Sequence, residues 1–169
     1  MNPVSSPFLR LVPGLFPALL ALVLAVPGAR AQQPGARPVK IFIMAGQSNM
    51  QGHGNMTPAA TPGTLEHTVA NDPAGDYQFV SDGGGWKTWN DVWIHYERSA
   101  STVRTGNLTA GFGSSDTTIG PEVGFGSVVG DHYSSQVLLI KTAWGGKSLA
   151  VDFRPPSSGG TTGFYYNEI

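Results

Sequence analysis

The stretch VKIFIMAGQSNM, residues 39–50, decides the fold. Its first six residues form an apolar run rich in β-branched side chains and bounded by glycine, and this pattern predicts a buried strand of a parallel sheet. Residues 46–54 are flanked by glycines and are expected to form a turn that opens a short helix. Ser48 therefore follows a strand directly, at the edge where open α/β sheets place their ligands.

Two later segments extend this pattern. Pro121 suits the first position of a helix and Glu122 complements the helix dipole, so a helix is predicted to begin here. Its expected apolar face consists of Val123, Phe125, Val128 and Val129. The same helix carries three glycines that either weaken it or let it pack closely on the sheet: Gly124, Gly126 and Gly130. Residues 136–142 predict a second buried strand, and the alternation of strand, helix and strand indicates an α/β fold.

Residues 55–115 differ in character from the segments around them. They are rich in Gly, Thr, Asp and aromatic residues, and we interpret them as a β-rich insertion over one end of the sheet. Within it, residues 77–80 and 86–89 flank the turn sequence SDGGG and are expected to pair as a hairpin. Residues 91–97 are a further strand candidate.

The N-terminus reads as a signal peptide over residues 1–31. Arg10 precedes an apolar run at residues 11–26, and Ala29 and Ala31 fit the small-residue rule for cleavage after Ala31. The alternative is an uncleaved membrane anchor, but the run contains prolines and is short for a spanning helix. We expect a secreted or periplasmic protein with no stable membrane insertion after cleavage, in which residues 32–38 form a linker.

Composition excludes several kinds of site. The sequence has no cysteine, which rules out a disulfide framework and a thiolate metal site. Its formal net charge is -1 and it has no basic stripe, so no nucleic-acid partner is expected.

The sequence does not match two known motifs, the nucleophile elbow of α/β-hydrolases and the phosphate-binding loop. An α/β-hydrolase elbow needs glycine two residues after the serine, where this chain has Met50. A phosphate-binding loop ending at Gly146 and Lys147 would begin with glycine at the position of Lys141. From spacing alone, Ser48 is either a nucleophile or the N-cap of the short helix.

The block GQSNM, residues 46–50, resembles the nucleophile block of the sialate O-acetylesterase-like group within the SGNH hydrolases. Further segments match that family in order, and the resemblance covers about residues 39–168. They are GPE at 120–122, LLIK at 138–141, WGGKSL at 144–149 and DFRPP at 152–156.

The resemblance implies a three-layer α/β/α, flavodoxin-like fold and hydrolysis of O-acetyl esters on sugars, of the sialic acid or xylan type. It implies a Ser-His-Asp type site without metal or cofactor, with Ser48 as nucleophile. The Ser48 N–H and a glycine N–H, Gly146 in preference to Gly145, would form part of the oxyanion hole. Residues that would line the site are Gln47, Asn49, Glu122, Trp144 and Gly145.

Two family blocks are missing from the sequence. Neither the Gln-Gly segment that should end a later strand nor the Asp-x-x-His segment that supplies the base occurs, and only two convincing parallel strands are predicted. We therefore expect an N-terminal piece of the enzyme that is inactive and unstable on its own. The competing interpretations are a non-catalytic sugar-binding module and a pseudoenzyme fragment.

Other candidates for catalysis have plain structural alternatives. His53 is the histidine closest to Ser48 in sequence, His67 falls in a polar loop, His95 in a strand and His132 at a helix end, where a cation suits the dipole. Glu122 either complements the dipole or holds the Ser48 turn. Trp144 either packs in the core or stacks on a sugar.

Overall fold

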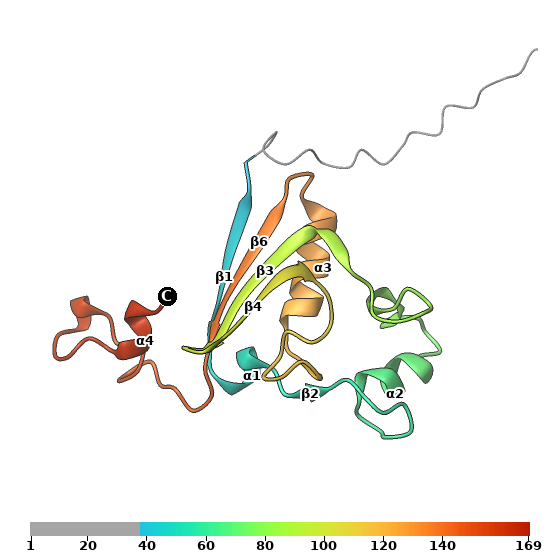
Figure 1. Cartoon of the computed structure of the whole chain (residues 1–169), viewed down its shortest axis with the longest axis horizontal. Coiled ribbons are helices and arrows are strands. Elements are labelled where there is room, and N and C mark those ends of the chain that lie inside the picture. The colour runs from blue at the N-terminus through green and yellow to red at the C-terminus, as the bar shows by residue number, and fades with distance from the viewer. Residues whose placement is uncertain (1–37) are drawn as a thin grey trace, which may run out of the picture. The chain divides into compact units, whose positions relative to one another are not determined.

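A computed structural model describes residues 38–169. The predicted signal peptide and nearly all of the predicted linker lie outside the described residues. The fold is built on a mixed, mostly parallel sheet in the order β1-β6-β3-β4, in which only β4 is antiparallel to its neighbour (Figure 1). The strands are β1 Lys40–Gly46, β6 Val137–Ala143, β3 Trp89–Ser99 and β4 Thr102–Leu108.

The two predicted parallel strands are confirmed and are direct neighbours. β1 pairs with β6 along its whole length, from Lys40 opposite Val137 to Gly46 opposite Ala143. Both strands therefore end at the same edge of the sheet. The turns that follow them, which carry the candidate site residues, lie beside each other.

The interpretation of residues 55–115 as an insertion over the sheet is wrong for its second half. The predicted strand at 91–97 exists, but it belongs to β3, which pairs in parallel with β6 inside the central sheet. Val92, Ile94 and Tyr96 are fully buried on one face of it. Alternation in the sequence revealed the strand, but it carries no information about which strand is the neighbour.

The predicted hairpin is mostly absent. Residues 78–80 form a 3₁₀ helix, η1 Gln78–Val80, and only an isolated bridge between Ser81 and Trp86 remains. The reason lies upstream, where the Asp72 carboxylate accepts hydrogen bonds from the backbone N–H groups of Gly75 and Tyr77 and holds the chain in a turn. That turn prevents an extended strand from starting at Tyr77.

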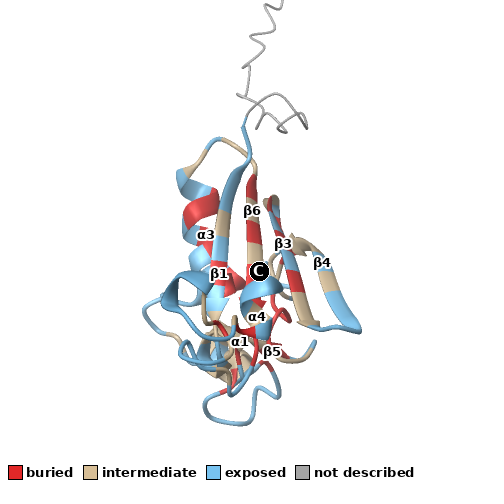
Figure 2. Cartoon of the chain, turned by 90° about the vertical axis from the view of Figure 1, so that its left-hand side faces the viewer, coloured by how far each residue is buried: buried red, intermediate tan, exposed pale blue. Residues whose placement is uncertain are grey.

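The predicted helix is α3 Glu122–His132, but its buried face differs from the expected one. Val123 and Val129 are buried, whereas Val128 is 68% exposed. The glycines take the place of an apolar stripe: a Cβ on Gly126 would overlap Leu108 Cδ2, and one on Gly130 would lie 2.6 Å from Val92 Cγ2. Close packing on the sheet therefore explains Gly126 and Gly130, whereas a Cβ on Gly124 would meet nothing within 4 Å. Figures 1 and 2 show α3 lying along one face of the sheet.

The remaining elements surround the edge of the sheet where β1 and β6 end. β2 and β5 form a separate two-stranded antiparallel sheet. These elements are α1 Ser48–Gln51, β2 Gly54–Asn55, α2 Leu65–Ala70, β5 Thr118–Ile119, η2 Pro156–Ser158 and α4 Phe164–Asn167.

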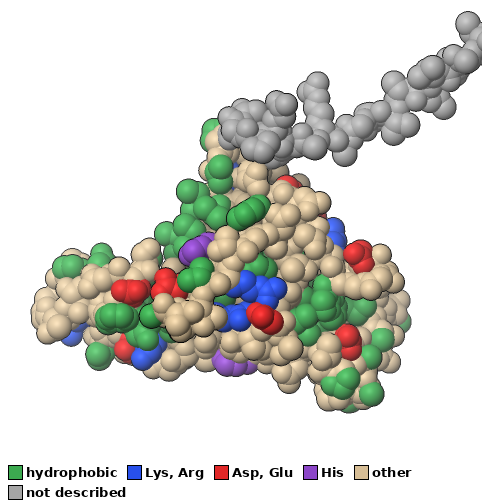
Figure 3. Space-filling view, viewed as in Figure 1, with side chains coloured by type: hydrophobic (Ala, Val, Ile, Leu, Met, Phe, Trp, Pro, Cys, Tyr) green, Lys and Arg blue, Asp and Glu red, His purple; other side chains and the backbone are tan. Residues whose placement is uncertain are grey.

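The sheet face opposite α3 is apolar and open among the described residues. Ile41 and Trp93 both lie level with Leu138 of β6, and they are 58% and 43% exposed. Ile43, one row further along, is 59% exposed. Figure 3 shows hydrophobic side chains gathered over these strands. The α/β class is confirmed, but residues 38–169 supply helices to one face and do not form the expected three layers.

Candidate active site

Ser48 is the first residue of α1, two residues after the end of β1, and lies next to the glycine turn that follows β6. The backbone N–H of Trp144 donates to the carbonyl oxygen of Gly46 at 3.3 Å and joins the two turns. Gly145 and Gly146 are exposed, and Gly146 has φ 72°, a left-handed conformation that favours glycine. The backbone N–H groups expected to complete an oxyanion hole therefore sit one strand away from Ser48.

Gln47 controls the immediate surroundings of Ser48. Its Oε1 accepts a hydrogen bond from the Ser48 backbone N–H at 3.3 Å and from the Ser48 hydroxyl at 3.1 Å. Gln47, and not Ser48, is thus the N-cap of α1, which excludes the N-cap role considered for Ser48. A carbonyl oxygen entering this site would replace Gln47 as the acceptor of that N–H.

A buried ion pair lies beneath the Ser48 turn. Lys141 Nζ is 2.6 Å from Glu122 Oε2, and both side chains are fully buried. Lys141 also donates to the carbonyl oxygens of Gln51 at 2.9 Å and Phe112 at 2.8 Å, while Glu122 Oε1 accepts from the Gly120 N–H at 2.8 Å. Because Gln51 ends α1, this pair connects the Ser48 helix to the start of α3. Of the two roles considered for Glu122, this geometry favours holding the turn.

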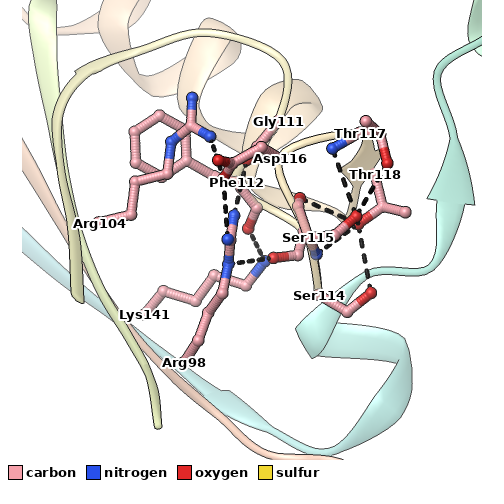
Figure 4. Close-up of polar contacts among 11 residues, drawn as sticks. Arg98, Arg104, Gly111, Phe112, Ser114, Ser115, Asp116, Thr117, Thr118 and Lys141 are labelled. Atoms are coloured by element: carbon pink, nitrogen blue, oxygen red, sulfur yellow. Dashed lines mark hydrogen bonds and ion pairs between the residues drawn. The ribbon is translucent and has the colours of Figure 1, made fainter. Parts of the chain in front are cut away.

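A second polar cluster fastens the loop that precedes β5. Arg98 donates to the carbonyl oxygens of Gly113 and Gly111, both at 2.9 Å, and Arg98 and Arg104 each form an ion pair with Asp116 (Figure 4). The loop is joined to the chain after α1 because the Ser114 N–H donates to the Gly52 carbonyl oxygen at 2.8 Å. Backbone hydrogen bonds therefore hold the chain on both sides of α1, at Gly46 before the helix and at Gly52 after it.

Charge and burial shift the pKa values of three side chains at this edge of the sheet. Burial raises the pKa of Tyr96 to about 12, against the opposing effect of the nearby Arg98 cation. Burial also lowers the pKa of Lys141, and the adjacent Glu122 carboxylate opposes that shift. Hydrogen bonds from Arg98 and Arg104 lower the pKa of the exposed Asp116 carboxyl.

Comparison with known families decides the affiliation of the chain. The model of the family described as carbohydrate esterase, sialic acid-specific acetylesterase, matches residues 38–169. The chain belongs to this family. The resemblance carried by the GQSNM block is thereby confirmed.

Comparison with individual proteins adds little to the family assignment. No curated protein matches the chain. Among solved structures, it is similar to a protein of Arabidopsis thaliana determined by X-ray diffraction at 1.6 Å resolution, with 18% sequence identity and a TM-score of 0.42. That match covers 78% of this chain and 48% of the Arabidopsis one, so this chain spans about half the length of that relative.

Two histidines of this carbohydrate esterase family member lie beside hydroxyl groups other than that of Ser48. His53 Nδ1 lies 3.1 Å from Ser114 Oγ, and His95 Nδ1 lies 2.9 Å from Thr105 Oγ1. His67 belongs to α2 and not to a loop, and His132 lies in the last turn of α3 as predicted. Within residues 38–169 the hydroxyl of Ser48 is hydrogen-bonded to Gln47 and to no histidine.

Trp144 is buried in an aromatic cluster at the site. Its ring centroid lies 4.7 Å from that of Tyr165 and 6.0 Å from that of Phe153, and only 6% of the residue is exposed. It therefore supports the glycine turn from below, which favours the packing role over direct stacking on a sugar. Asn49 is exposed on α1.

No group of three or more metal-ligating side chains occurs among residues 38–169. In the same residues, no helix is long and apolar enough to cross a membrane.

Sequence reasoning missed Lys141, Arg98 and Asp116. Lys141 was placed in a strand, but its position suggested nothing about its partner, because Glu122 lies 19 residues away. A signal was present: a lysine inside an apolar strand must be paired when it is buried. The ion pair between Arg98 and Asp116 joins β3 to the loop before β5. These two residues are far apart in the sequence, so no local sequence pattern indicates that they pair.

Proposed function

We propose that Ser48 is the nucleophile of an esterase that removes O-acetyl groups from sugars. The observation that carries this proposal is the position of Ser48, which begins α1 two residues after the end of β1, beside the Gly145–Gly146 turn in a chain of the carbohydrate esterase family. That placement suits attack on a carbonyl whose oxygen is received by backbone N–H groups.

The reaction runs in two steps. Ser48 Oγ bonds to the acetyl carbon, the bond from that carbon to the sugar oxygen breaks, and the sugar leaves as an alcohol with a proton. Water then attacks the acetyl-serine, which releases acetate and restores the hydroxyl. The Ser48 N–H would turn from Gln47 Oε1 to the carbonyl oxygen as the negative charge develops there, with the Gly146 N–H as the second donor.

The base is the part of this mechanism that the chain does not hold. The family resemblance implies a histidine from an Asp-x-x-His segment, and the 169 residues contain no such segment. A serine hydroxyl without a base is a weak nucleophile. The 169-residue chain by itself is therefore expected to release no acetate.

The test is covalent labelling of the full-length gene product with a fluorophosphonate. We expect Ser48 to carry the label, Ser48→Ala to lose both the label and acetate release, and Ser157→Ala, which removes an exposed serine in η2, to keep both. Release of acetate that survives Ser48→Ala would sink the proposal. A gene product that binds acetylated sugars but takes no label would point instead to a sugar-binding module.

Export is part of the proposal. Residues 1–31 have the charge, apolar run and small residues of a signal peptide cleaved after Ala31, which gives a secreted or periplasmic protein. The mature chain would then begin at Gln32. N-terminal sequencing of the exported protein checks this, and a chain that retains Arg10 would contradict it.

A further inference from the structure

A pocket of about 160 Å³ opens where β3 ends, beside the turn that follows β6. Its lining combines aromatic and charged side chains with two small residues: Trp144, Phe164, Tyr165, Glu97, Arg98, Glu168, Ser99 and Ala100. We propose that this pocket binds an uncharged sugar ring of the acetylated substrate, which makes neutral glycans and not sialic acids the preferred class. This inference rests on the proposed esterase function.

The pocket lies on the same edge of the sheet as Ser48. The strand order is β1-β6-β3, all three strands are parallel, and their C-terminal ends carry Ser48, the Trp144 turn and Glu97 in that sequence. Neighbouring strands are about 4.8 Å apart, so the end of β3 is roughly 10 Å from the end of β1. An oligosaccharide with its acetyl group at Ser48 can therefore reach the pocket with a nearby ring.

The aromatic wall of the pocket is held in place. The Tyr165 ring packs on both Trp144 and Phe153, at 4.7 and 5.9 Å between centroids. The Tyr165 N–H donates to the Asp152 carbonyl oxygen at 3.0 Å, and the Gly163 N–H donates to the Arg154 carbonyl oxygen at 2.9 Å. These bonds fix the segment that carries Phe164, which is itself 64% exposed.

The groups in the pocket suit the chemistry of a neutral sugar. Phe164 and Tyr165 offer apolar ring surface for the C–H faces of a pyranose. Glu97 and Glu168 offer carboxylate oxygens, which accept hydrogen bonds and therefore match sugar hydroxyl donors. A few polar groups among aromatic ones is the usual composition of a small-molecule site.

The cations near the pocket are already engaged. Arg98 donates to the carbonyl oxygens of Gly111 and Gly113 and pairs with Asp116 at 2.8 Å, which uses all three of its nitrogens. Lys147 lies 3.8 Å from Asp152 and faces the Tyr165 ring. The Arg98 guanidinium in the pocket lining therefore has no pair of free nitrogens for a bidentate bond to a substrate carboxylate.

The free charges of the pocket are then negative. Glu97 and Glu168 would repel the carboxylate of a sialic acid, and like charges brought together in an interface are disfavoured. A neutral acetylated sugar meets no such cost. The charge balance therefore selects between the two substrate types that the family resemblance leaves open.

The experiment compares three esters with the full-length gene product: acetylated xylo-oligosaccharide, O-acetylated sialic acid and 4-nitrophenyl acetate. We expect kcat/KM for the xylo-oligosaccharide to exceed that for the sialic acid by about tenfold or more. Phe164→Ala should raise KM for the xylo-oligosaccharide about tenfold and leave 4-nitrophenyl acetate, which has no sugar, unchanged. Tyr166→Ala, on the same helix α4 but outside the pocket lining, is the matched control.

Charge is tested separately with Glu168→Gln, which should improve the use of O-acetylated sialic acid and leave 4-nitrophenyl acetate unchanged. A preference for the sialic acid ester, or equal effects of Phe164→Ala on all three esters, would overturn the pocket assignment. Loss of all hydrolysis, in contrast, would count against the esterase itself. In that case, binding of unacetylated xylo-oligosaccharide, weakened by Phe164→Ala and not by Tyr166→Ala, would still support the pocket.

Discussion

At the scale of single residues, the Lys141–Glu122 pair determines how firmly the Ser48 turn is held. Lys141→Met leaves the Glu122 carboxylate buried without its partner and removes the donor to the Gln51 and Phe112 carbonyl oxygens. We expect a loss of about 3–5 kcal/mol in the free energy of unfolding. Urea denaturation followed by tryptophan fluorescence measures it.

Two further variants keep that prediction specific. Lys141→Met combined with Glu122→Leu removes both charges and should recover a large part of the loss, because no unpaired charge remains buried. Lys147→Met breaks the partly exposed pair with Asp152 and the contact with the Tyr165 ring, and it should change stability by about 0–1 kcal/mol. A cost for Lys141→Met no larger than that for Lys147→Met would show that the buried pair is not what secures this region.

The sequence located the candidate nucleophile better than it located the contacts that support it. Ser48 was recognised because its motif is contiguous and follows a strand, which is a local pattern. Gln47 was expected to line the site, but its bond to the Ser48 N–H depends on a side-chain rotamer that no sequence pattern encodes. Lys141 contacts three segments that are distant in the chain, so its role emerges only from the fold.

At the scale of elements, α3 packs on the sheet through glycines. Two glycine-to-alanine substitutions in α3 should therefore change the free energy of unfolding in opposite directions. A Cβ on Gly126 would overlap Leu108 and lie 3.0 Å from Leu139 Cδ1, whereas one on Gly124 would meet nothing within 4 Å. Gly126→Ala should therefore destabilise the fold by about 1–3 kcal/mol. Gly124→Ala should stabilise it by about 0.5–1 kcal/mol, because alanine favours the helix and no contact opposes it.

Urea denaturation of both variants measures the difference in their free energies of unfolding. If Gly126→Ala were as stable as Gly124→Ala, α3 would not pack against β4 and β6 as closely as described. The same packing explains why the predicted apolar face was wrong. The pattern of Val and Phe marked a helix correctly, but the residues nearest the sheet are the smallest ones, and hydrophobicity alone does not rank them first.

At the scale of the whole molecule, the order of the strands was the part that the sequence did not reveal. A strand was expected at residues 91–97, yet it was assigned to an insertion because residues 55–115 are rich in Gly, Thr, Asp and aromatic residues. Register with β6 is decided by burial on the α3 face, where Ile94 lies level with Leu139 and both are fully buried. Such pairing across the chain is a property of the assembled sheet.

The open face of that sheet leads to the last prediction. Parallel sheets are normally covered on both faces, yet Ile41 and Ile43 are each more than half exposed in the part of the chain that the structure describes. We expect the 169-residue chain to bind the dye ANS under native conditions and to associate as its concentration rises. The double variant Ile41→Thr with Ile43→Thr keeps β-branched side chains in the strand and should lower both signals. Leu149→Thr, which removes an exposed leucine from a loop outside the sheet, should lower neither. Fluorescence titration and light scattering measure the two effects, and a native chain that neither binds the dye nor associates would mean that this face is covered.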